Sequence, residues 1–275
     1  MTRPRISARI SLLAALLLVA LLPLAWTVLA SLGIVPDNSA TPPTWSGAPS
    51  LDEYTDTIGV AEPHFASELA TSVAIALFAT ALVIACAFLG AYGLARWRGR
   101  GATVIVPSML VLGSLPAVAY VIPLAETIRR LGLTDTLAGV GLAQAAAAAP
   151  LAVYILHGYL ADLPVELEDA ARLDGAGLPS IVRSVVLPQV APAVVATAVV
   201  IFVLQWNSFL VPLVLGSEQV RTIPVALSDF FTFERELQWP TAAAALVSSV
   251  LPLLLLIAAA NALLQRFRLA EADPT

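Results

Sequence analysis

The sequence contains no lysine, and this absence excludes several kinds of chemistry. All fourteen of its basic residues are arginines. A nucleotide-binding P-loop needs a lysine to reach the phosphates, and Schiff-base catalysis needs a lysine amine. We therefore expect that the chain carries no standard ATP-hydrolysing motif and binds no cofactor of its own.

Cysteine and charged residues are also scarce. The single cysteine, Cys86, lies in an apolar run, so we interpret it as a small buried hydrophobe and expect no disulfide and no metal site. Only 12% of the 275 residues are charged and 59% are hydrophobic, with a mean hydropathy of +0.88. Soluble domains carry about 25% charged residues, so this composition indicates an integral membrane protein. The isoelectric point near 5.0 and the lack of a basic run argue against a nucleic-acid partner.

Long apolar runs dominate the sequence. A helix needs about 20 apolar residues to cross the hydrocarbon of a bilayer. Six windows meet this requirement, at residues 9–32, 72–95, 102–124, 137–157, 191–213 and 241–263. The first follows three arginines, as a secretory signal does, but it is longer than a signal core and contains Pro23 and Trp26. We interpret it as a retained span.

The distribution of arginine predicts the orientation of these spans, because cytoplasmic loops are enriched in basic residues. With the N-terminus inside, ten arginines fall in cytoplasmic segments and four in outer segments. We therefore expect both termini to be cytoplasmic and the protein to be a multi-pass protein of the plasma membrane. The long loop 33–66 contains no arginine and many turn residues, so we expect an irregular external segment in which His64 is solvated.

No polar connection is long enough to build a soluble core, so residues 1–275 are predicted to form a single, all-α transmembrane domain. Four prolines lie within the third, fourth and fifth windows, at positions 116, 123, 150 and 192. They are expected to break or bend those spans, which suits rigid segments that rock during transport.

A charged segment, residues 158–190, interrupts the apolar chain between the fourth and fifth windows. Within it, VELEDAARLD after Pro164 has good helix formers, with Glu168 placed four residues before Arg172. Gly175 is predicted to end this helix. A second short helix, SIVRSVV, is predicted to close at Pro188. The segment is thus expected to be a bent pair of helices.

The composition of the first helix favours a protein partner over a lipid surface. Helices that lie on lipid headgroups are usually basic and bury bulky apolar groups. This helix has four acidic residues, counting Asp174, against one arginine, and Ala170 and Ala171 form its middle. Insertion into a protein cleft therefore suits it better, and adsorption to the membrane surface is the alternative.

The spacing of this segment resembles a known motif. Asp169-Ala170-Ala171, three residues, Gly175, nine residues, Val185, one residue and Leu187-Pro188 resemble the EAA loop of permease subunits in binding-protein-dependent ABC importers. The family has glutamate at the position of Asp169 and isoleucine at that of Val185. The flanking RLDGA is similar to the carbohydrate-uptake branch, the maltose-type second permease.

Five more stretches resemble that branch and follow its order. They are AYGLARWRGRG (91–101), LPAVAYVIPL (115–124), RLGLTDT (130–136), WNSFLVPL (206–213) and RTIPVAL (221–227). The resemblance covers roughly residues 68 to 265.

The resemblance implies a division of labour between several chains. In such importers this permease pairs with a second, different permease beneath an extracytoplasmic solute-binding protein. Two copies of a cytoplasmic ATPase, which use ATP and Mg, receive the EAA helices in surface clefts. The implied coupling residues here are Glu166, Glu168, Asp169, Ala170, Ala171, Arg172, Asp174, Gly175, Leu187 and Pro188. The family's glutamate pairs with an arginine of the ATPase. Because Asp169 is one methylene shorter, either the helix docks slightly deeper or Glu168 or Glu166 supplies part of the charge.

A polar cluster in the fifth window is the candidate for the path of a carbohydrate substrate. It consists of Gln205, Trp206, Asn207 and Ser208. Amides hydrogen-bond sugar hydroxyls, and an indole stacks on their C–H faces. Alternatively, Trp206 packs against the partner permease and Asn207 caps a kink. Gln144 and Asn261 are interpreted as interhelical hydrogen-bonding groups.

Two other classes of function were weighed against this one. An ion-coupled secondary transporter normally has acidic residues or histidine near the middle of the membrane, and these windows have none there. An intramembrane enzyme would need HExxH, GxSxG or clustered acids, and the sequence contains none of these inside its windows. We therefore assign no catalytic residue.

Overall fold

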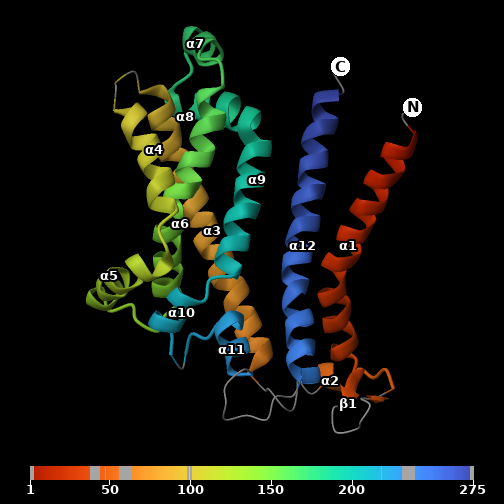
Figure 1. Ribbon diagram of the computed structural model, residues 1–275. Coiled ribbons are helices and arrows are strands. Elements are labelled where there is room, and N and C mark those ends of the chain that lie inside the picture. The colour runs from red at the N-terminus through yellow and green to blue at the C-terminus, as the bar shows by residue number, and fades with distance from the viewer. Residues whose placement is uncertain are drawn as a thin grey trace. The chain divides into compact units, whose positions relative to one another are not determined.

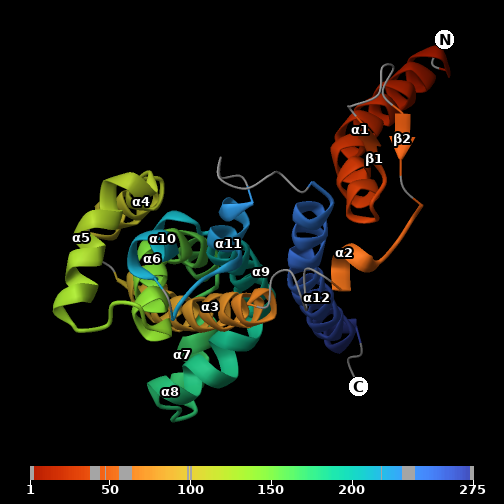
Figure 2. The same ribbon diagram turned by 90° about the horizontal axis from the view of Figure 1, so that it is seen from below.

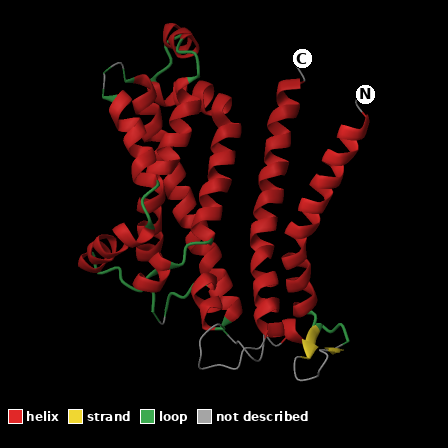
Figure 3. Cartoon of the chain, viewed as in Figure 1, coloured by secondary structure: helices red, strands yellow, loops and turns green. Residues whose placement is uncertain are grey.

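The computed structural model describes residues 3–37, 44–46, 48–55, 64–97, 99, 101–217, 219–230 and 239–272, and most of these residues are helical (Figures 1 and 3). The chain divides into two compact units. Unit 1 comprises residues 1–67 and 226–251, and unit 2 comprises residues 68–225 and 252–275. The single domain expected from the sequence stays a prediction.

Unit 1 contains α1 (Arg3–Ser31), α2 (Asp52–Thr55) and the first half of α12 (Trp239–Ala272). Strands β1 (Val35–Asp37) and β2 (Thr44–Ser46) pair antiparallel. The expectation of an irregular loop is therefore wrong for these described residues, since strand pairing satisfies the backbone of a turn-rich segment. Residues 38–43, 47 and 56–63 of that loop lie outside the described part of the chain.

Unit 2 contains the rest of α12 and most of the other helices. They are α3 (Phe65–Arg96), α4 (Ala102–Gly113), α5 (Ala117–Arg130), α6 (Leu137–Ala161), α7 (Glu166–Leu173), α8 (Leu178–Ile181), the π-helical turn η2 (Val182–Val186), α9 (Leu187–Trp206) and α10 (Leu210–Leu215). The short helix α11 (Ile223–Asp229) is divided between the two units. Its main core joins α3, α6 and α9, and small residues such as Ala79, Ala87 and Ala152 let these helices approach closely. Figure 2 shows α4 and α5 beside α6 and α10.

Five described helices are long and apolar enough to cross a membrane, or up to six if a bent pair counts as one span. The five long segments overlap five of the six predicted windows, although the fifth window, 191–213, runs beyond the end of its helix at Trp206. Cys86, which was expected to be buried, is exposed on α3. An apolar side chain of a membrane helix can face lipid as well as the core, so the expectation of burial was wrong.

The third predicted window is not a continuous helix. Its chain bends by 96° between α4 and α5. Pro116 has an extended backbone and precedes α5 (φ −64°, ψ 142°), and a proline disfavours helical geometry in the residue before it. The structure thus confirms that Pro116 breaks its span. α4 alone is about 18 Å long, shorter than the hydrocarbon of about 30 Å.

The prediction for Pro188 was wrong. Instead of ending a helix, Pro188 lies in the first turn of α9, and α8, η2 and α9 form one continuous helical segment from Leu178 to Trp206. The physical reason lies in η2. Pro188 has no N–H to donate, and in a regular helix its ring would clash with the carbonyl of the preceding turn. The π-helical turn just before it shifts the hydrogen-bond register, so the helix continues through Pro188.

Asp135, in the turn between α5 and α6, holds the segment that follows α10 through hydrogen bonds. Its carboxylate accepts hydrogen bonds from the backbone N–H groups of Ser217, Gln219 and Val220, at 2.8 to 3.1 Å, and from the Ser217 hydroxyl at 2.7 Å. Its own N–H donates to the carbonyl of Leu215 at 2.9 Å. Partial desolvation raises the pKa of Asp135, but the four hydrogen bonds outweigh it and lower the pKa from 3.8 to about 2.

Asp135→Asn should lower the thermal stability of the purified protein by about 1 kcal/mol, because the backbone donors lose a charged acceptor. Asparagine tolerates the positive φ of 55° at this position, so the backbone is not strained by the change. A carboxyl group with a depressed pKa stabilises the fold above pH 3.8, and this contribution is lost as the pH falls through about 2. The difference in thermal midpoint should therefore close on acidification.

Asp162→Asn is the matched control, since Asp162 is an exposed aspartate at the opposite end of α6. A midpoint difference for Asp135→Asn that stays constant down to pH about 2 would contradict the charged role of Asp135.

Candidate docking loop and polar pocket

The loop between α6 and α9 contains the predicted first helix, α7. Three acidic residues lie in its first turn and Arg172 in its last, which suits the helix dipole. Gly175 follows with φ +83°, a backbone conformation that costs glycine little. The N–H of Ala176 donates to the carbonyl of Ala171 at 3.0 Å and caps the helix end. The structure therefore confirms the predicted helix and its glycine terminus.

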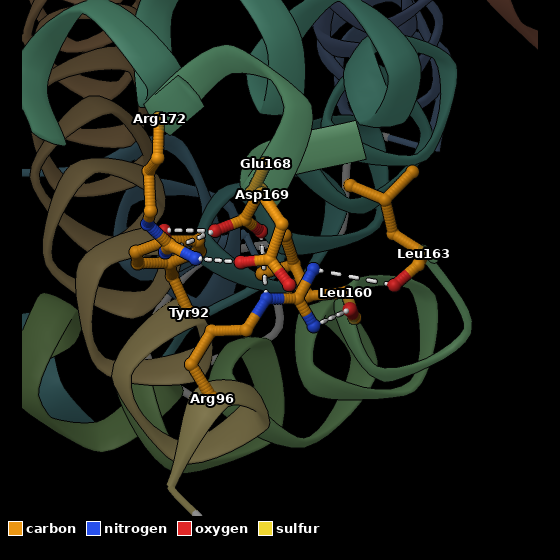
Figure 4. Close-up of polar contacts among 7 residues, drawn as sticks. All are labelled: Tyr92, Arg96, Leu160, Leu163, Glu168, Asp169 and Arg172. Carbon is orange, nitrogen blue, oxygen red and sulfur yellow. Dashed lines mark hydrogen bonds and ion pairs between the residues drawn. The ribbon is translucent and has the colours of Figure 1, made fainter. Parts of the chain in front are cut away.

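Glu168 anchors α7 to the body of unit 2 (Figure 4). Its side chain is completely buried, at 0% exposure. Tyr92 Oη donates to Glu168 Oε2 and Arg96 Nε donates to Oε1, both at 2.7 Å. Arg172 Nη2 donates to Oε2 at 3.2 Å. A buried carboxylate is tolerable only when it is paired and hydrogen-bonded, and these three donors satisfy it.

Arg96 extends the anchor to the end of α6. Its Nη1 donates to the carbonyl of Leu160 at 3.0 Å, and its Nη2 donates to that of Leu163 at 3.3 Å. The guanidinium therefore joins three segments, because it lies on α3, pairs with a carboxylate of α7 and caps carbonyls where α6 ends. We call Tyr92, Arg96 and Glu168 the clamp.

The clamp corrects the prediction for Glu168. A carboxylate with no exposed surface and three partners in its own chain cannot pair with an arginine of another subunit. Asp169 is the accessible neighbour, since its side chain is 59% exposed and forms an ion pair only across the surface with Arg172. Glu166 is also exposed. Of the three acidic candidates, Asp169 and Glu166 are the ones available to a partner.

The outer surface of the loop is both acidic and apolar. Leu173 is 90% exposed, while Leu178 and Leu167 are about half exposed. Ala170 and Asp174 are also exposed, whereas Ala171 packs against the core. Exposed leucines beside acidic groups favour burial against a partner, so this surface, which we call the loop face, is suited to docking. Leu187 and Pro188, which were grouped with these residues, begin α9 instead.

A polar pocket of about 300 Å³ lies in unit 2 where α9 gives way to α10. It is lined by residues from the α4–α5 junction, α6, and the end of α9 through α10. Gln205, Asn207 and Ser208, three of the four predicted pathway residues, are among them, together with Gln144 and Tyr120. Amide, hydroxyl and aromatic groups therefore gather in one cavity whose other walls are largely alanine and leucine, a composition typical of small-molecule sites.

Some polar groups of the pocket also form hydrogen bonds that stabilise the helices around it. Gln205 Nε2 donates to the backbone carbonyl of Gln144 at 3.1 Å and joins α9 to α6. Asn207 Nδ2 donates to the carbonyl of Val203 at 2.8 Å, and Asn207 caps α9, as the alternative interpretation held. Within the described chain, the buried Oε1 of Gln144 has no hydrogen-bond partner. The interhelical hydrogen bond of Gln144 is thus made by its backbone carbonyl, whereas its side-chain oxygen accepts none within the described chain.

Trp206 does not line this pocket, unlike the other three residues of the predicted cluster. Its ring stacks on Phe202 with centroids 6.0 Å apart and 15° between the planes, and it contacts Ala76 in a small core. The next residue along a helix points about 100° away, so Trp206 cannot share the face of Gln205. Because it is only 7% exposed within its own chain, it is not available to a partner permease either.

The sequence analysis missed Tyr92, Arg96 and Tyr120. The arginine was counted only as an orientation signal, and both tyrosines lay in stretches cited only for their resemblance. The available signal was an arginine at the end of an apolar span together with an acidic loop later in the chain, since such charges can form a buried ion pair. In the described part of the chain, no three histidine, cysteine, aspartate or glutamate residues are grouped so that they could hold a metal ion.

Comparison with known proteins finds a family match. Residues 84–269 match the binding-protein-dependent transport system inner membrane component family. The chain is 32% identical over 239 residues to a trehalose transport system permease protein of Mycobacterium tuberculosis, which covers 84% of each chain. It is 29% identical over 246 residues to a trehalose/maltose transport system permease protein of Thermococcus litoralis, covering 87% of this chain and 86% of the relative.

A further relative is a sulfoquinovosyl glycerol transport system permease protein of Agrobacterium fabrum, 31% identical over 88% of this chain and 85% of the relative. Among solved structures, a chain of a bacterial ABC transporter involved in the import of alginate matches with a TM-score of 0.76. The identity is 20%, and the match covers 95% of this chain and 98% of that one. At this identity the likeness concerns the fold.

Glu168→Ala should destabilise the loop by about 3 kcal/mol, since it leaves the partly buried Arg96 without its carboxylate. Limited proteolysis of the purified protein should then cut near Gly175 faster than in the wild type. Asp169→Ala is the matched control, because it removes a neighbouring carboxylate whose ion pair is exposed. Equal cleavage rates in both variants would show that Glu168 does not hold the loop.

Proposed function

The chain belongs to the binding-protein-dependent transport system inner membrane component family, and we propose that it is the permease subunit of an ATP-driven carbohydrate importer. Membership of this family makes the chain a multi-pass membrane component, with ATP hydrolysis in separate subunits. In this proposal the chain forms half of the translocation pathway, and a second, different permease forms the other half. Two copies of a cytoplasmic ATPase and an extracytoplasmic solute-binding protein complete the complex.

The observation that carries the proposal is the loop face, held rigidly against the body by the clamp. A short helix fixed at one face and exposed at the other can transmit the movement of a partner, whereas a flexible loop would absorb it. The loop face is cytoplasmic in the orientation that the arginines predict, with six spans when α4 and α5 are counted together. Asp169 is proposed to pair with an arginine of the ATPase.

The carbohydrate class rests on the relatives and on the pocket. The permease proteins compared above serve, by their names, trehalose, maltose and sulfoquinovosyl glycerol transport. The pocket supports a hydroxyl-rich ligand, because Asn207, Ser208 and Tyr120 are neutral groups that both donate and accept hydrogen bonds.

Ion-coupled secondary transport is not favoured. Among the described residues, the buried carboxylates are those of Glu68 in α3 and Glu168 in α7, and each is paired with an arginine near a helix end. A proton or sodium site would need an accessible acidic group near the middle of the membrane.

Asp169→Arg should reduce ATP-dependent uptake by the reconstituted complex more than about tenfold, because a charge reversal leaves the opposing arginine unpaired in its cleft. Asp169→Glu restores the side chain of the related loops and should support uptake. Glu126→Arg is the control, since Glu126 is an exposed, ion-paired carboxylate outside the loop. The measurements are copurification of the ATPase, its hydrolysis rate and uptake of labelled sugar.

This proposal fails if Asp169→Arg imports sugar as tightly coupled to ATP hydrolysis as the wild type does. It also fails if the purified chain transports solute without an ATPase.

Asn207→Ala and Ser208→Ala should each weaken transport of the sugar by about threefold to tenfold, the effect of one lost neutral hydrogen bond. Trp206→Phe should lower the thermal midpoint instead, with sugar selectivity unchanged, because Trp206 packs in the core. Uptake kinetics over a panel of sugars distinguish the two effects. If both alanine variants keep wild-type affinity, selectivity and rate, the pocket is not part of the pathway.

A further inference from the structure

Among the long described helices, α3 differs from the rest. Six other helices, α1, α4, α5, α6, α9 and α12, contain an internal proline, at positions 23, 107, 123, 150, 192 and 252. The 32 residues of α3 contain none. Proline removes a helical hydrogen bond and bends the helix, so α3 lacks the weak point that the other helices have.

Both ends of α3 carry a buried or partly buried ion pair. At its C-terminal end, Arg96 pairs with Glu168 of the clamp at 2.7 Å. At its N-terminal end, Glu68 Oε1 lies 3.0 Å from Arg221 Nε, in the loop between α10 and α11. One turn along, Ser72 Oγ accepts a hydrogen bond from the N–H of Ile223 at 2.8 Å, and Ser72 is 4% exposed.

The distance between these attachments matches a membrane. Glu68 and Arg96 are 28 residues apart, which is about 42 Å of helix, the thickness of a bilayer with its headgroups. The loop that holds Arg221 is also tied to the α5–α6 turn by Asp135. These contacts form one continuous connection from the loop face, along α3, to the segment 215–223 at the opposite end of the helix.

We propose that α3 is a rigid rod that links the loop face to the segment 215–223 across the membrane. In this proposal, which rests on the proposed function, Arg96 and Glu168 are positioning residues at one end, and Glu68 and Arg221 are positioning residues at the other. Events at the outer surface, such as arrival of the loaded binding protein, then reach the ATPase through α3, and breaking either end uncouples them.

The first test measures stimulation of ATP hydrolysis by loaded binding protein in the reconstituted complex. Glu68→Arg should reduce the stimulation at least about fivefold, the lower range of typical coupling between sites. Adding Arg221→Glu should restore it, because the ion pair is rebuilt with its charges exchanged. Glu126→Gln is the control, since it removes exposed ion pairs with Arg129 and Arg130 that touch neither end of α3.

The second test measures rigidity directly, and its main comparison is made with both ion pairs of α3 intact. Spin labels on Ala70→Cys and Leu173→Cys, both exposed positions, report the distance from the start of α3 to the loop face in a Cys86→Ser parent. The distance should be the same with and without ATP. Arg96→Met should broaden the distribution and make it respond to ATP.

The outcomes separate this inference from the proposed function. A complex that imports sugar while the label distance changes with ATP, or while Glu68→Arg keeps full stimulation, would overturn the rod. If the ATPase does not copurify or no ATP-dependent uptake occurs in the parent, the proposed function itself fails.

Discussion

The rest of unit 2 is organised around one buried carboxylate. Glu168 has no contact with solvent, so its charge must be balanced inside the chain, and Arg96 and Tyr92 of α3 supply the balance. The same arginine satisfies the carbonyl groups where α6 ends. A lone charge in this position would cost several kcal/mol, and therefore the loop cannot leave α3 without separating the ion pair.

This constraint divides the loop into two faces with different roles. The inner face, with Glu168 and Ala171, belongs to the core of unit 2, while Asp169, Ala170 and Leu173 remain exposed. An ATPase that binds the outer face would therefore move the helices of unit 2 together with the loop, because the clamp joins them. The helices around the pocket contain prolines and the chain breaks at Pro116, whereas α3 contains no proline. The unit therefore combines one stiff element with several that a proline weakens.

The sequence could predict features that depend on neighbouring residues, but not those that depend on contacts between distant segments. The helix α7 and its glycine end follow from local signals, and the structure confirms them. The break at Pro116 was foreseen as a possible bend, but the 96° turn was not, because the angle depends on how α5 packs against α10 and α6. Three of the four predicted pathway residues line the pocket, and Trp206 does not, because adjacent helical positions face different neighbours.

The sequence by itself determined the membrane class, the approximate positions of five long apolar helices, the lack of a nucleotide-binding motif and the position of the helical loop between α6 and α9. These follow from composition and from short-range patterns. Only the tertiary structure decided which of the adjacent acidic residues is buried and that Trp206 packs in a core. The reason is physical: Glu168 differs from Asp169 only through contact with Arg96, 72 residues away, and a pattern of neighbours does not contain a contact between distant segments.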